Sequence, residues 1–509
     1  MVQNGFSRGR YRAGPRGSYS IAMVLVLVGM CFLAFLVGAG ISMKAYLYIA
    51  PLILVVPTVF LLMRPDLCLW LLTGLILIVA GGLKYFLGLG QFQWAVSGLG
   101  LALLMYSLIR QAFSRDEERS TTGGIALVMM LWWVILLFSS AANALPFMDW
   151  LVGLRIYLPI FGVFVYIAYC KPDQATLRKV VFFMLFIAAI QWVFCLYQRI
   201  EILPVRLASK YPGSPWDSIV GTFGGDKFGG GESGSLGIYL SMAVALGAAL
   251  FKKDLMRPFF FALLLVFSVA AMAMVESKVI AIMVPLGLFI VYRDHMVKHP
   301  VRFLLGSQIV LFAMFMLLVA YYYLYWSESG SHSLIEAIKI RLAYSFDPHF
   351  QATTVSLGRV KSLIFWWEKN SLTQDPLAFL LGHGLASAVS FSSIIGEGTA
   401  VARYKTILDV TGISKLLWES GILGAGAFLM IFFVGALRAR ELKSNPLIPQ
   451  WHQALMTGVE ASMVLMALSV FYEVTVVSSP PMQFSAMFLL GYVAYWWRVS
   501  TGVKVGSKI

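Results

Sequence analysis

Residues 21–41 read IAMVLVLVGMCFLAFLVGAGI, a run of 21 residues without a charged side chain. A helix needs about 20 apolar residues to cross the hydrocarbon core of a bilayer, so this run is long enough to span it. It is too long for the apolar part of a secretory signal, and we therefore expect a retained first helix. The Gly-, Ser- and Arg-rich residues 1–18 are predicted to form a disordered basic tail near anionic headgroups.

Similar runs recur along the whole chain of 509 residues, which is 60% hydrophobic with a mean hydropathy of +0.82. The runs are continuous rather than alternating, which favours helices over a β-barrel. The sequence thus predicts an all-α, polytopic membrane protein with about 14 (12–14) transmembrane helices. The predicted runs begin near Tyr19, Lys44, Asp66, Gln91, Gly124, Trp150, Arg178, Ser235, Pro258, Lys278, Phe303, Ile413, His452 and Gln483.

The distribution of charge indicates how the chain is threaded. If the N-terminus is cytoplasmic, the inner segments carry 23 Lys and Arg against 8 Asp and Glu, a charge of 23 − 8 = +15. The remainder carries 39 − 23 = 16 basic and 24 − 8 = 16 acidic residues, so the whole formal charge of +15 falls on one side. Cytoplasmic loops are enriched in Lys and Arg, which supports cytoplasmic N- and C-termini. Since short inner loops account for the basic residues, nucleic-acid binding is not indicated.

This threading predicts one transmembrane domain over residues 19–499 and a short cytoplasmic tail over 500–509. Two long outer loops, residues 198–234 and 327–412, concentrate the polar side chains. The second loop is too long for a simple connection. Residues 334–346 and 359–372 show helical spacing of apolar residues, and we expect surface helices that cover the outer membrane face.

The cysteines and histidines do not indicate a metal site. Cys31, Cys68, Cys170 and Cys195 lie in or at the ends of apolar runs without paired spacing, which also argues against a disulfide framework. The six histidines lack the spacing of metal ligands. The glycine-rich stretch does not end in Gly-Lys-Ser/Thr, so ATP binding is not indicated, and we predict no cofactor.

Ionisable residues inside apolar runs are candidates for function because charge in hydrocarbon is costly. Arg155, Glu419 and Glu460 belong to this class, while Lys278 and Glu473, with Glu276, are predicted at outer helix ends. A structural pairing, for example of Arg155 with Glu419, is as plausible from the sequence as catalysis.

Three segments resemble the O-antigen ligase and O-antigen polymerase superfamily of bacterial membrane glycosyltransferases. The first is Gly-Thr-Phe-Gly-Gly at 221–225, leading to the helix predicted from Gly234, and the second is Glu-Ser-Lys at 276–278. The third runs from Arg359 through the tryptophans at 366 and 367 to Gly-His-Gly at 382–384, followed by Leu-Leu-Trp-Glu-Ser-Gly at 416–421. The resemblance covers roughly residues 150 to 440.

The chain departs from the family pattern at two points. Lys278 stands where the family has an arginine, so the charge is kept but the bidentate fork is lost. The ligase branch has a histidine before the Leu-Leu helix, whereas this chain has Asp409-Val410-Thr411-Gly412. The second departure favours a polymerase over a ligase.

The resemblance implies a GT-C-like fold and a reaction in which a glycan hydroxyl displaces a lipid diphosphate from an anomeric carbon. Cations that hold the phosphates make a metal unnecessary. The candidate diphosphate ligands are Arg359 and Lys278, with Arg155 third. The candidate bases for the acceptor are Asp409, then His383 and Glu397. The alternatives stay open from the residues alone: Arg359 could cap or solvate a surface helix, Asp409 could be an acidic residue that the dipole favours at a helix N-terminus, and His383 could be a turn residue.

The stretch from Gly221 to Gly237 contains eight glycines. It could form a backbone nest for phosphate before the next helix, but we favour a flexible gate for glycan entry. Lys227 is the only cation within it, and Gly221, Lys227 and Gly234 are the candidate residues of this loop.

The sequence therefore predicts a bacterial inner-membrane polymerase that joins undecaprenyl-diphosphate-linked oligosaccharide repeats into O-antigen, capsular or exopolysaccharide on the outer side. A flippase and a chain-length regulator are the expected partners, besides membrane lipid. Two alternatives remain: a ligase that transfers finished glycan to a lipid or protein acceptor, and a transporter of the lipid-linked glycan. A transporter usually shows related halves and broken midplane helices, whereas the polar mass here lies in two outer loops.

Overall fold

The computed structural model describes residues 63–113, 121–209, 215–226, 231–275, 277–321 and, with short gaps, 339–506. The chain divides into two units, Met1–Leu67 and Cys68–Ile509, and the following description concerns the second unit. Within the described residues the secondary structure is helical, apart from two isolated bridges, Gln351 with Leu357 and Ser392 with Gly396. The protein is thus a helical membrane protein, as its composition predicts.

Among the described residues, seven helical stretches are long and apolar enough to cross a membrane. The number of about 14 spans stays a prediction, because the first two predicted runs lie outside the described residues. The seven stretches are Pro65–Leu87, Gln93–Phe113, Ile125–Ala142, Phe147–Cys170, Gln174–Ala208, Ser233–Phe251 and Gly412–Leu442.

The predicted starts lie close to the observed ones. The run predicted from Asp66 is α3 (Pro65–Gly74), which continues through a π-helical turn at Leu75–Val79 into α4 (Ala80–Leu87). The remaining long helices are α5 (Gln93–Phe113), α6 (Ile125–Ala142), α7 (Phe147–Cys170), α8 (Gln174–Tyr197), α10 (Ser233–Phe251), α11 (Pro258–Met274), α12 (Ile280–Lys298), α13 (Pro300–Tyr321), α18 (Gly412–Leu442), α19 (Gln450–Ser469) and α21 (Pro480–Gly506).

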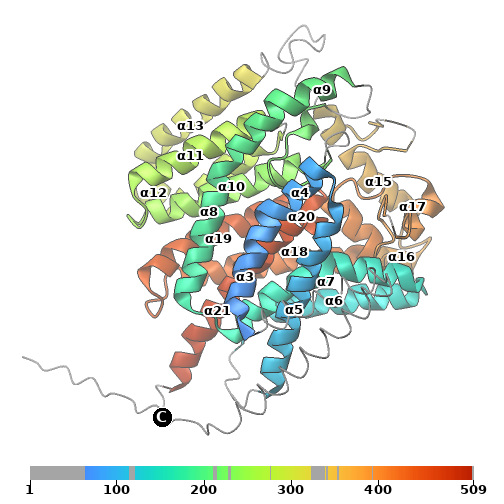
Figure 1. Ribbon diagram of the computed structural model, residues 1–509, viewed down its shortest axis with the longest axis horizontal. Helices are drawn as coiled ribbons and strands as arrows, with labels where there is room; N and C mark the ends of the chain where they lie inside the picture. Colours follow the sequence, from blue (N-terminus) through green and yellow to red (C-terminus); the bar gives the residue numbers. More distant parts are fainter. Residues whose placement is uncertain are drawn as a thin grey trace, which may run out of the picture. The chain divides into compact units, whose positions relative to one another are not determined.

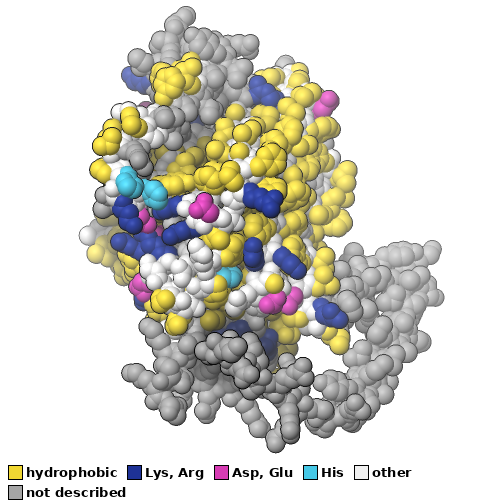
Figure 2. All heavy atoms as spheres, turned by 90° about the vertical axis from the view of Figure 1, so that its left-hand side faces the viewer, with side chains coloured by type: hydrophobic (Ala, Val, Ile, Leu, Met, Phe, Trp, Pro, Cys, Tyr) yellow, Lys and Arg dark blue, Asp and Glu magenta, His cyan; other side chains and the backbone are white. Residues whose placement is uncertain are grey.

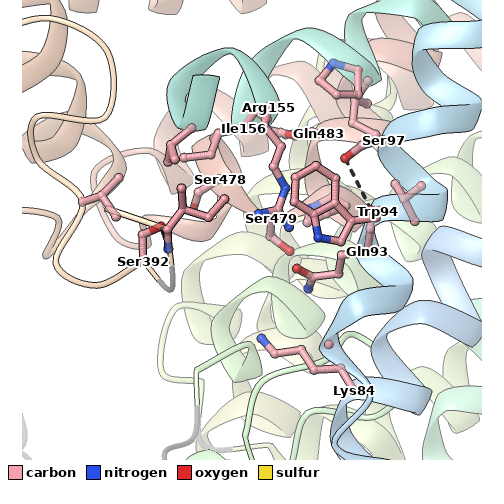
Figure 3. Close-up of a pocket in the computed structure, with 18 of the residues that line it drawn as sticks. Lys84, Gln93, Trp94, Ser97, Arg155, Ile156, Ser392, Ser478, Ser479 and Gln483 are labelled. Carbon is pink, nitrogen blue, oxygen red and sulfur yellow. Dashed lines mark hydrogen bonds between the residues drawn. The ribbon is translucent and has the colours of Figure 1, made fainter. Parts of the chain in front are cut away.

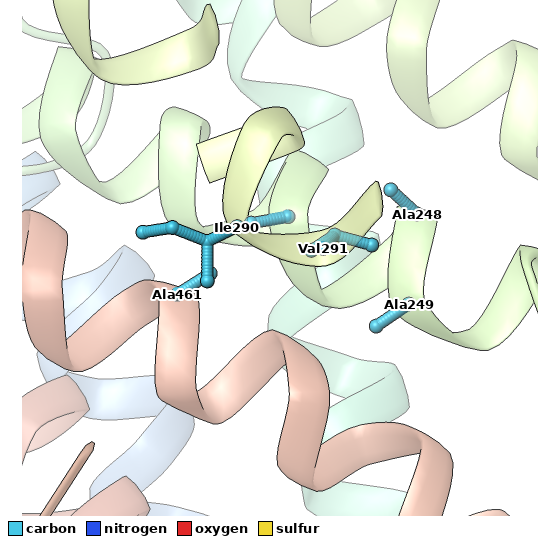
Figure 4. Packing of buried hydrophobic residues seen from close by; sticks show 6 residues of the cluster. Ala248, Ala249, Ile290, Val291 and Ala461 are labelled. Atoms are coloured by element: carbon cyan, nitrogen blue, oxygen red, sulfur yellow. The ribbon is translucent and has the colours of Figure 1, made fainter. Parts of the chain in front are cut away.

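Helix α10 forms the centre of the bundle, and nearly all of its side chains are buried. It packs against α8, α11, α12 and α19. Figure 4 shows how small residues permit this: Val291 of α12 points toward Ala248 and Ala249 of α10, and Ile290 of α12 lies beside Ala461 of α19. Small side chains at crossings let helix backbones approach closely, which is how helices associate when lipid surrounds them.

The helices of this unit pack in separate groups (Figure 1). Helices α11, α12 and α13 lie together with α8 and α10, while α5 packs along α7 and α6 packs along α18. The short helices of the second long loop, α15 (Arg359–Lys369), α16 (Pro376–Leu381) and α17 (Thr399–Tyr404), gather beside α18.

The predicted surface helix at 359–372 is present as α15, but part of the helix is buried inside the protein. Trp366 is buried with Trp418 and Leu408 in one aromatic cluster, and its indole nitrogen donates to the Leu417 carbonyl at 3.1 Å. Trp367 is the exposed member of the pair. Most of the other predicted helix, 334–346, lies outside the described residues, although 342–346 is helical.

Helix α18 is broken at Gly421, whose φ of 63° lies in the left-handed region. A Cβ on Gly421 would lie 2.3 Å from the Leu380 carbonyl carbon at the end of α16. The break therefore depends on close backbone contact, which only glycine allows.

One predicted membrane carboxylate, Glu460 on α19, is neutralised by cations from other helices. Arg293 of α12 lies 2.8 Å from one Glu460 oxygen, and Lys443 lies 3.7 Å from the other. Glu460 thus ties helix ends together.

On the face of the molecule drawn in Figure 2, hydrophobic side chains cover a broad area, and Lys, Arg and His side chains are gathered beside them.

Candidate functional site

A cavity of about 710 Å³ opens where α4 ends and α10 begins (Figure 3). Its walls come from α4 and α5, from α7, from residues 389–394 of the second long loop, and from residues 478–483 at the start of α21. Residues separated by almost 400 positions therefore share one pocket. We call this cavity the α7 pocket.

Two cations line the α7 pocket, Arg155 of α7 and Lys84 of α4. The guanidinium carbon of Arg155 lies 4.0 Å from the centre of the Trp94 ring. Figure 3 shows the Arg155 side chain beside Trp94, with Lys84 entering from the far end of the pocket. A cation stacked on an indole is held in place while its outer edge stays open to an anion.

The turn that follows Lys84 is fixed locally. Gly88 adopts a left-handed conformation, with φ of 70°, and its N–H donates to the Lys84 carbonyl at 3.1 Å. This is a common way to end a helix, because glycine accepts the positive φ without strain. The end of α4, and the lysine on it, are thereby positioned at the pocket.

A carboxylate, Glu232, also lines the α7 pocket, directly before the first residue of α10. Burial raises the pKa of Glu232, while the Ser479 and Ser235 hydroxyls and the positive charge of Lys84 act to lower it. Its Oε2 is buried and, like the nearby Ser479 hydroxyl, completes no hydrogen bond of normal geometry with the described residues. Two polar groups in the pocket wall are therefore left for a ligand.

Several neutral polar side chains complete the lining. They are Gln93, Ser97, Ser392, Ser478 and Gln483. Gln483 is held by its amide nitrogen, which donates to the carbonyls of Ile156 at 3.1 Å and Val477 at 2.5 Å. Such groups are suited to sugar hydroxyls, which both donate and accept hydrogen bonds.

Of the three predicted diphosphate ligands, the structure brings only Arg155 to the α7 pocket. Arg359 lies at the start of α15, where its Nε donates to the Tyr472 carbonyl and one Nη donates to Ser345, both at 2.7 Å. Its guanidinium also lies 3.8 Å from the centre of the Tyr472 ring. These contacts tie α15 to the turn after α19.

A neighbouring acid, Glu473, links Arg359 to the start of α10. Glu473 packs closely on Gly234: a Cβ added to Gly234 would lie 2.5 Å from a Glu473 carboxylate oxygen. Burial raises the pKa of Glu473 to about 8, Arg359 acts to lower it, and Glu232 and Asp217 act to raise it. Gly234 is therefore the residue that lets a carboxylate pack on the first turn of α10.

Lys278 lies in the turn that opens α12 and does not line the α7 pocket. The preceding residue, Ser277, is buried against α10, since its hydroxyl lies 2.9 Å from where a Cβ on Gly237 would be. The structure thus places Lys278 and Arg359 outside the pocket that holds Arg155.

The three predicted bases do not line the α7 pocket either. His383 is buried, stacks on Trp418 with ring centres 5.4 Å apart, and shares a 3.0 Å hydrogen bond with Asn370. Burial lowers the pKa of His383 to about 4, which makes it a weak base. Glu397 is exposed on the loop before α17.

Asp409 has a structural role next to the pocket. Its carboxylate accepts hydrogen bonds from the Ser390 hydroxyl and from the Ser390 backbone N–H, the latter at 3.4 Å. Ser390 lies between Val389 and Phe391, which both line the pocket. Asp409 therefore holds one pocket wall.

The interpretation of the glycine-rich stretch as a flexible gate is not supported for its described part. Gly221 to Gly225 is buried, and the Gln198 side chain bonds the N–H groups of Val220 and Gly221 at 2.9 and 2.8 Å. The Thr222 hydroxyl donates at 2.6 Å to the carbonyl of Leu77, which belongs to the π-helical turn. This is a fixed turn that supports α4, and Lys227 lies outside the described residues.

The suggested pairing of Arg155 with Glu419 is wrong. Glu419 is fully buried, lies 3.3 Å from the Lys415 ammonium and accepts a 2.5 Å hydrogen bond from Tyr157. Lys415 is one helical turn before Glu419 on α18, so the acid finds its cation locally and leaves Arg155 for the pocket.

Sequence reasoning missed Lys84 and Glu232. The signal for Lys84 was its isolated charge near the end of an apolar run, and for Glu232 its place directly before a buried helix. No group of three or more His, Cys, Asp or Glu side chains within the described part of the chain is arranged to hold a metal ion.

Comparison with known proteins adds no family to this picture. No family model matches the chain, and no curated protein is similar to it at a significant level. The site must therefore be interpreted from its own geometry.

Proposed function

We propose that this protein is a membrane glycosyltransferase that polymerises undecaprenyl-diphosphate-linked oligosaccharide repeats. The observation that carries the proposal is the α7 pocket, in which Arg155 and Lys84 share one cavity with neutral hydrogen-bonding groups. The order of the three family-like segments, all on one predicted side of the membrane, supports the same assignment.

The two cations suit a diphosphate. A guanidinium can bind two phosphate oxygens at once, and an ammonium adds a second point charge. In the proposed reaction the negative charge on the diphosphate grows as the bond to the sugar breaks. Fixed cations stabilise that developing charge, so the chain's own residues supply what a metal would otherwise provide.

Apolar side chains near the pocket suit the lipid part of the donor. Trp94 is 53% exposed and Phe391 is 79% exposed, and both line the pocket. Leu87 and Phe92, on either side of the turn between α4 and α5, are exposed as well. An isoprenoid chain could therefore leave the pocket toward lipid while its diphosphate stays with the cations.

The same threading that gives the positive inner loops places the α7 pocket on the outer side of a bacterial inner membrane, with both termini cytoplasmic. A flippase that delivers repeats to that side, and a chain-length regulator, would then be partners. The absence of a histidine at 409–412 favours a polymerase over a ligase.

Polymer formation in cells tests the proposal. Cells that carry Arg155→Ala or Lys84→Ala, at normal protein levels, should accumulate single lipid-linked repeats and lose the ladder of long polymer. Lys253→Ala is the matched control, because Lys253 is exposed and does not line the pocket. Ladders of normal length and amount from both pocket variants would overturn the assignment, and long lipid-linked polymer in deletion cells would indicate a ligase instead.

A further inference from the structure

We infer that Glu232 is the general base that accepts the proton of the attacking hydroxyl. This inference rests on the proposed glycosyl transfer and adds the residue that activates its acceptor. It replaces the bases predicted from the sequence, since Asp409, His383 and Glu397 lie outside the lining of the α7 pocket.

The position of Glu232 supports this role. It is the only Asp or Glu among the described residues that line the α7 pocket, where Arg155 and Lys84 are the cations. One of its carboxylate oxygens completes no hydrogen bond within the described structure. A base must keep a lone pair available for the proton that it takes, and this oxygen does so.

The charged and titratable groups around Glu232 come from several elements. Lys84 approaches from α4, and Glu473 acts from the turn between α19 and α20. Ser235 belongs to α10 itself, and Ser479 precedes α21. Burial favours the protonated acid and raises the pKa of Glu232, while the hydroxyls and Lys84 favour the carboxylate.

The step balances without another reactant. The acceptor oxygen forms a bond to the anomeric carbon, and the bond from that carbon to the phosphate oxygen breaks. The electron pair of the broken bond goes to the diphosphate, which Arg155 and Lys84 hold. The acceptor proton goes to Glu232, which is thereby neutralised and later returns the proton to water.

The experiment uses the full-length protein in lipid nanodiscs and lipid-linked repeats purified from cells that lack the gene. Glu232→Gln should lower the transfer rate at least about 100-fold, since general base catalysis contributes 10² to 10⁴. Binding of undecaprenyl diphosphate should stay unchanged or become tighter, because a negative charge near the phosphates is removed. A purely structural role for Glu232 would weaken binding as well.

The pH profile supplies a second readout. The wild-type rate should rise with pH as Glu232 loses its proton, and Glu232→Gln should abolish this dependence. Glu232→Asp should keep the dependence at a lower rate. If Glu232→Gln no longer binds undecaprenyl diphosphate, Glu232→Asp decides: transfer without the wild-type pH dependence in that variant, with binding intact, would refute the inference.

Different results would refute the role of Glu232 as general base and the glycosyltransferase function. A wild-type rate for Glu232→Gln, together with lost transfer for Arg155→Ala, would remove the base and leave the glycosyltransferase. Normal transfer by both Arg155→Ala and Lys84→Ala would remove the proposed function itself.

Discussion

The guanidinium of Arg155 lies over the indole of Trp94, 4.0 Å from the centre of the ring. The two residues come from different helices, α7 and α5, which cross closely: a Cβ on Gly100 would be 2.3 Å from the Pro159 carbonyl oxygen. This close crossing places the aromatic face beneath the cation. The stacking keeps Arg155 directed into the α7 pocket, and no carboxylate of the described residues forms an ion pair with it.

Replacing the aromatic platform should weaken the binding of a diphosphate without abolishing it. A cation–aromatic contact contributes about 0.5–2 kcal/mol, which corresponds to a roughly 2- to 30-fold loss of affinity for undecaprenyl diphosphate in Trp94→Leu. Titration of the purified protein in detergent measures this change. Phe113→Leu is the control, since Phe113 is exposed at the other end of α5 and does not line the pocket, and equal affinities for both variants would contradict the prediction.

The fixed Gly-Thr-Phe turn predicts opposite effects at two adjacent glycines of α4. In Gly81→Ala the new Cβ would lie 2.2 Å from the Thr222 carbonyl oxygen, whereas Gly82 has nothing within 4 Å. Gly81→Ala should cost about 1–3 kcal/mol of stability and displace Lys84, with loss of polymer. Gly82→Ala should be neutral or slightly stabilising. Thermal unfolding in detergent and polymer ladders test the pair, and similar behaviour of the two variants would argue against the packed turn.

The break in α18 gives a second matched pair. Gly421 has a positive φ and touches the backbone at the end of α16, while a Cβ at Gly426 on the same helix meets nothing within 4 Å. Gly421→Ala should lower the unfolding temperature markedly, because strain of about 1–3 kcal/mol adds to the backbone clash. Gly426→Ala should leave it unchanged. Equal unfolding temperatures would show that the break does not depend on glycine.

The raised pKa of Glu473, about 8, predicts a pH dependence of stability. A carboxyl group whose pKa is higher in the folded state stabilises the fold at low pH, and this contribution is lost as the pH rises from about 4.5 to about 8. Within this interval the loss is at most about 1.4 kcal/mol per pH unit. Glu473→Gln should therefore unfold at a higher temperature than wild type at pH 8 and show a flatter pH profile; parallel profiles of the two proteins would contradict the assignment.

Cysteine labelling tests the orientation on which the proposed function depends. In a variant with its four cysteines replaced by Ala, Glu397→Cys should react with a membrane-impermeant maleimide in intact cells, because Glu397 is exposed in the second long loop. Lys253→Cys, exposed between α10 and α11, should react only after permeabilisation. The reverse pattern would place the α7 pocket in the cytoplasm. Cysteines at Lys278 and Arg359 that label from opposite sides would remove the common outer face.

The sequence predicted the helices well because their signal is local. A continuous apolar run must become a helix if it lies in lipid, and the starts predicted near Gly124, Pro258 and Ile413 lie within one residue of α6, α11 and α18. The helix predicted at 359–372 from the helical spacing of its apolar residues is present as α15 (Arg359–Lys369).

The composition of the candidate site could not be predicted in this way. A pairing of Arg155 with Glu419 was one alternative that the sequence left open, but Lys415 lies one turn from that carboxylate on the same helix and forms the ion pair instead. It selected Arg359, Asp409 and His383 by residue type, yet each makes short contacts that hold the loop around the pocket rather than line it.

What the sequence by itself determined is the class of protein: apolar runs and the distribution of Lys and Arg fix a helical membrane chain through local solvation energy. Only the tertiary structure decided that Lys84, Arg155 and Glu232 share one cavity. These residues belong to three helical segments that are far apart in the chain, and the close crossings at Gly81 and Gly100 bring them together. Such crossings depend on which surfaces pack, a property that no local run of residues contains.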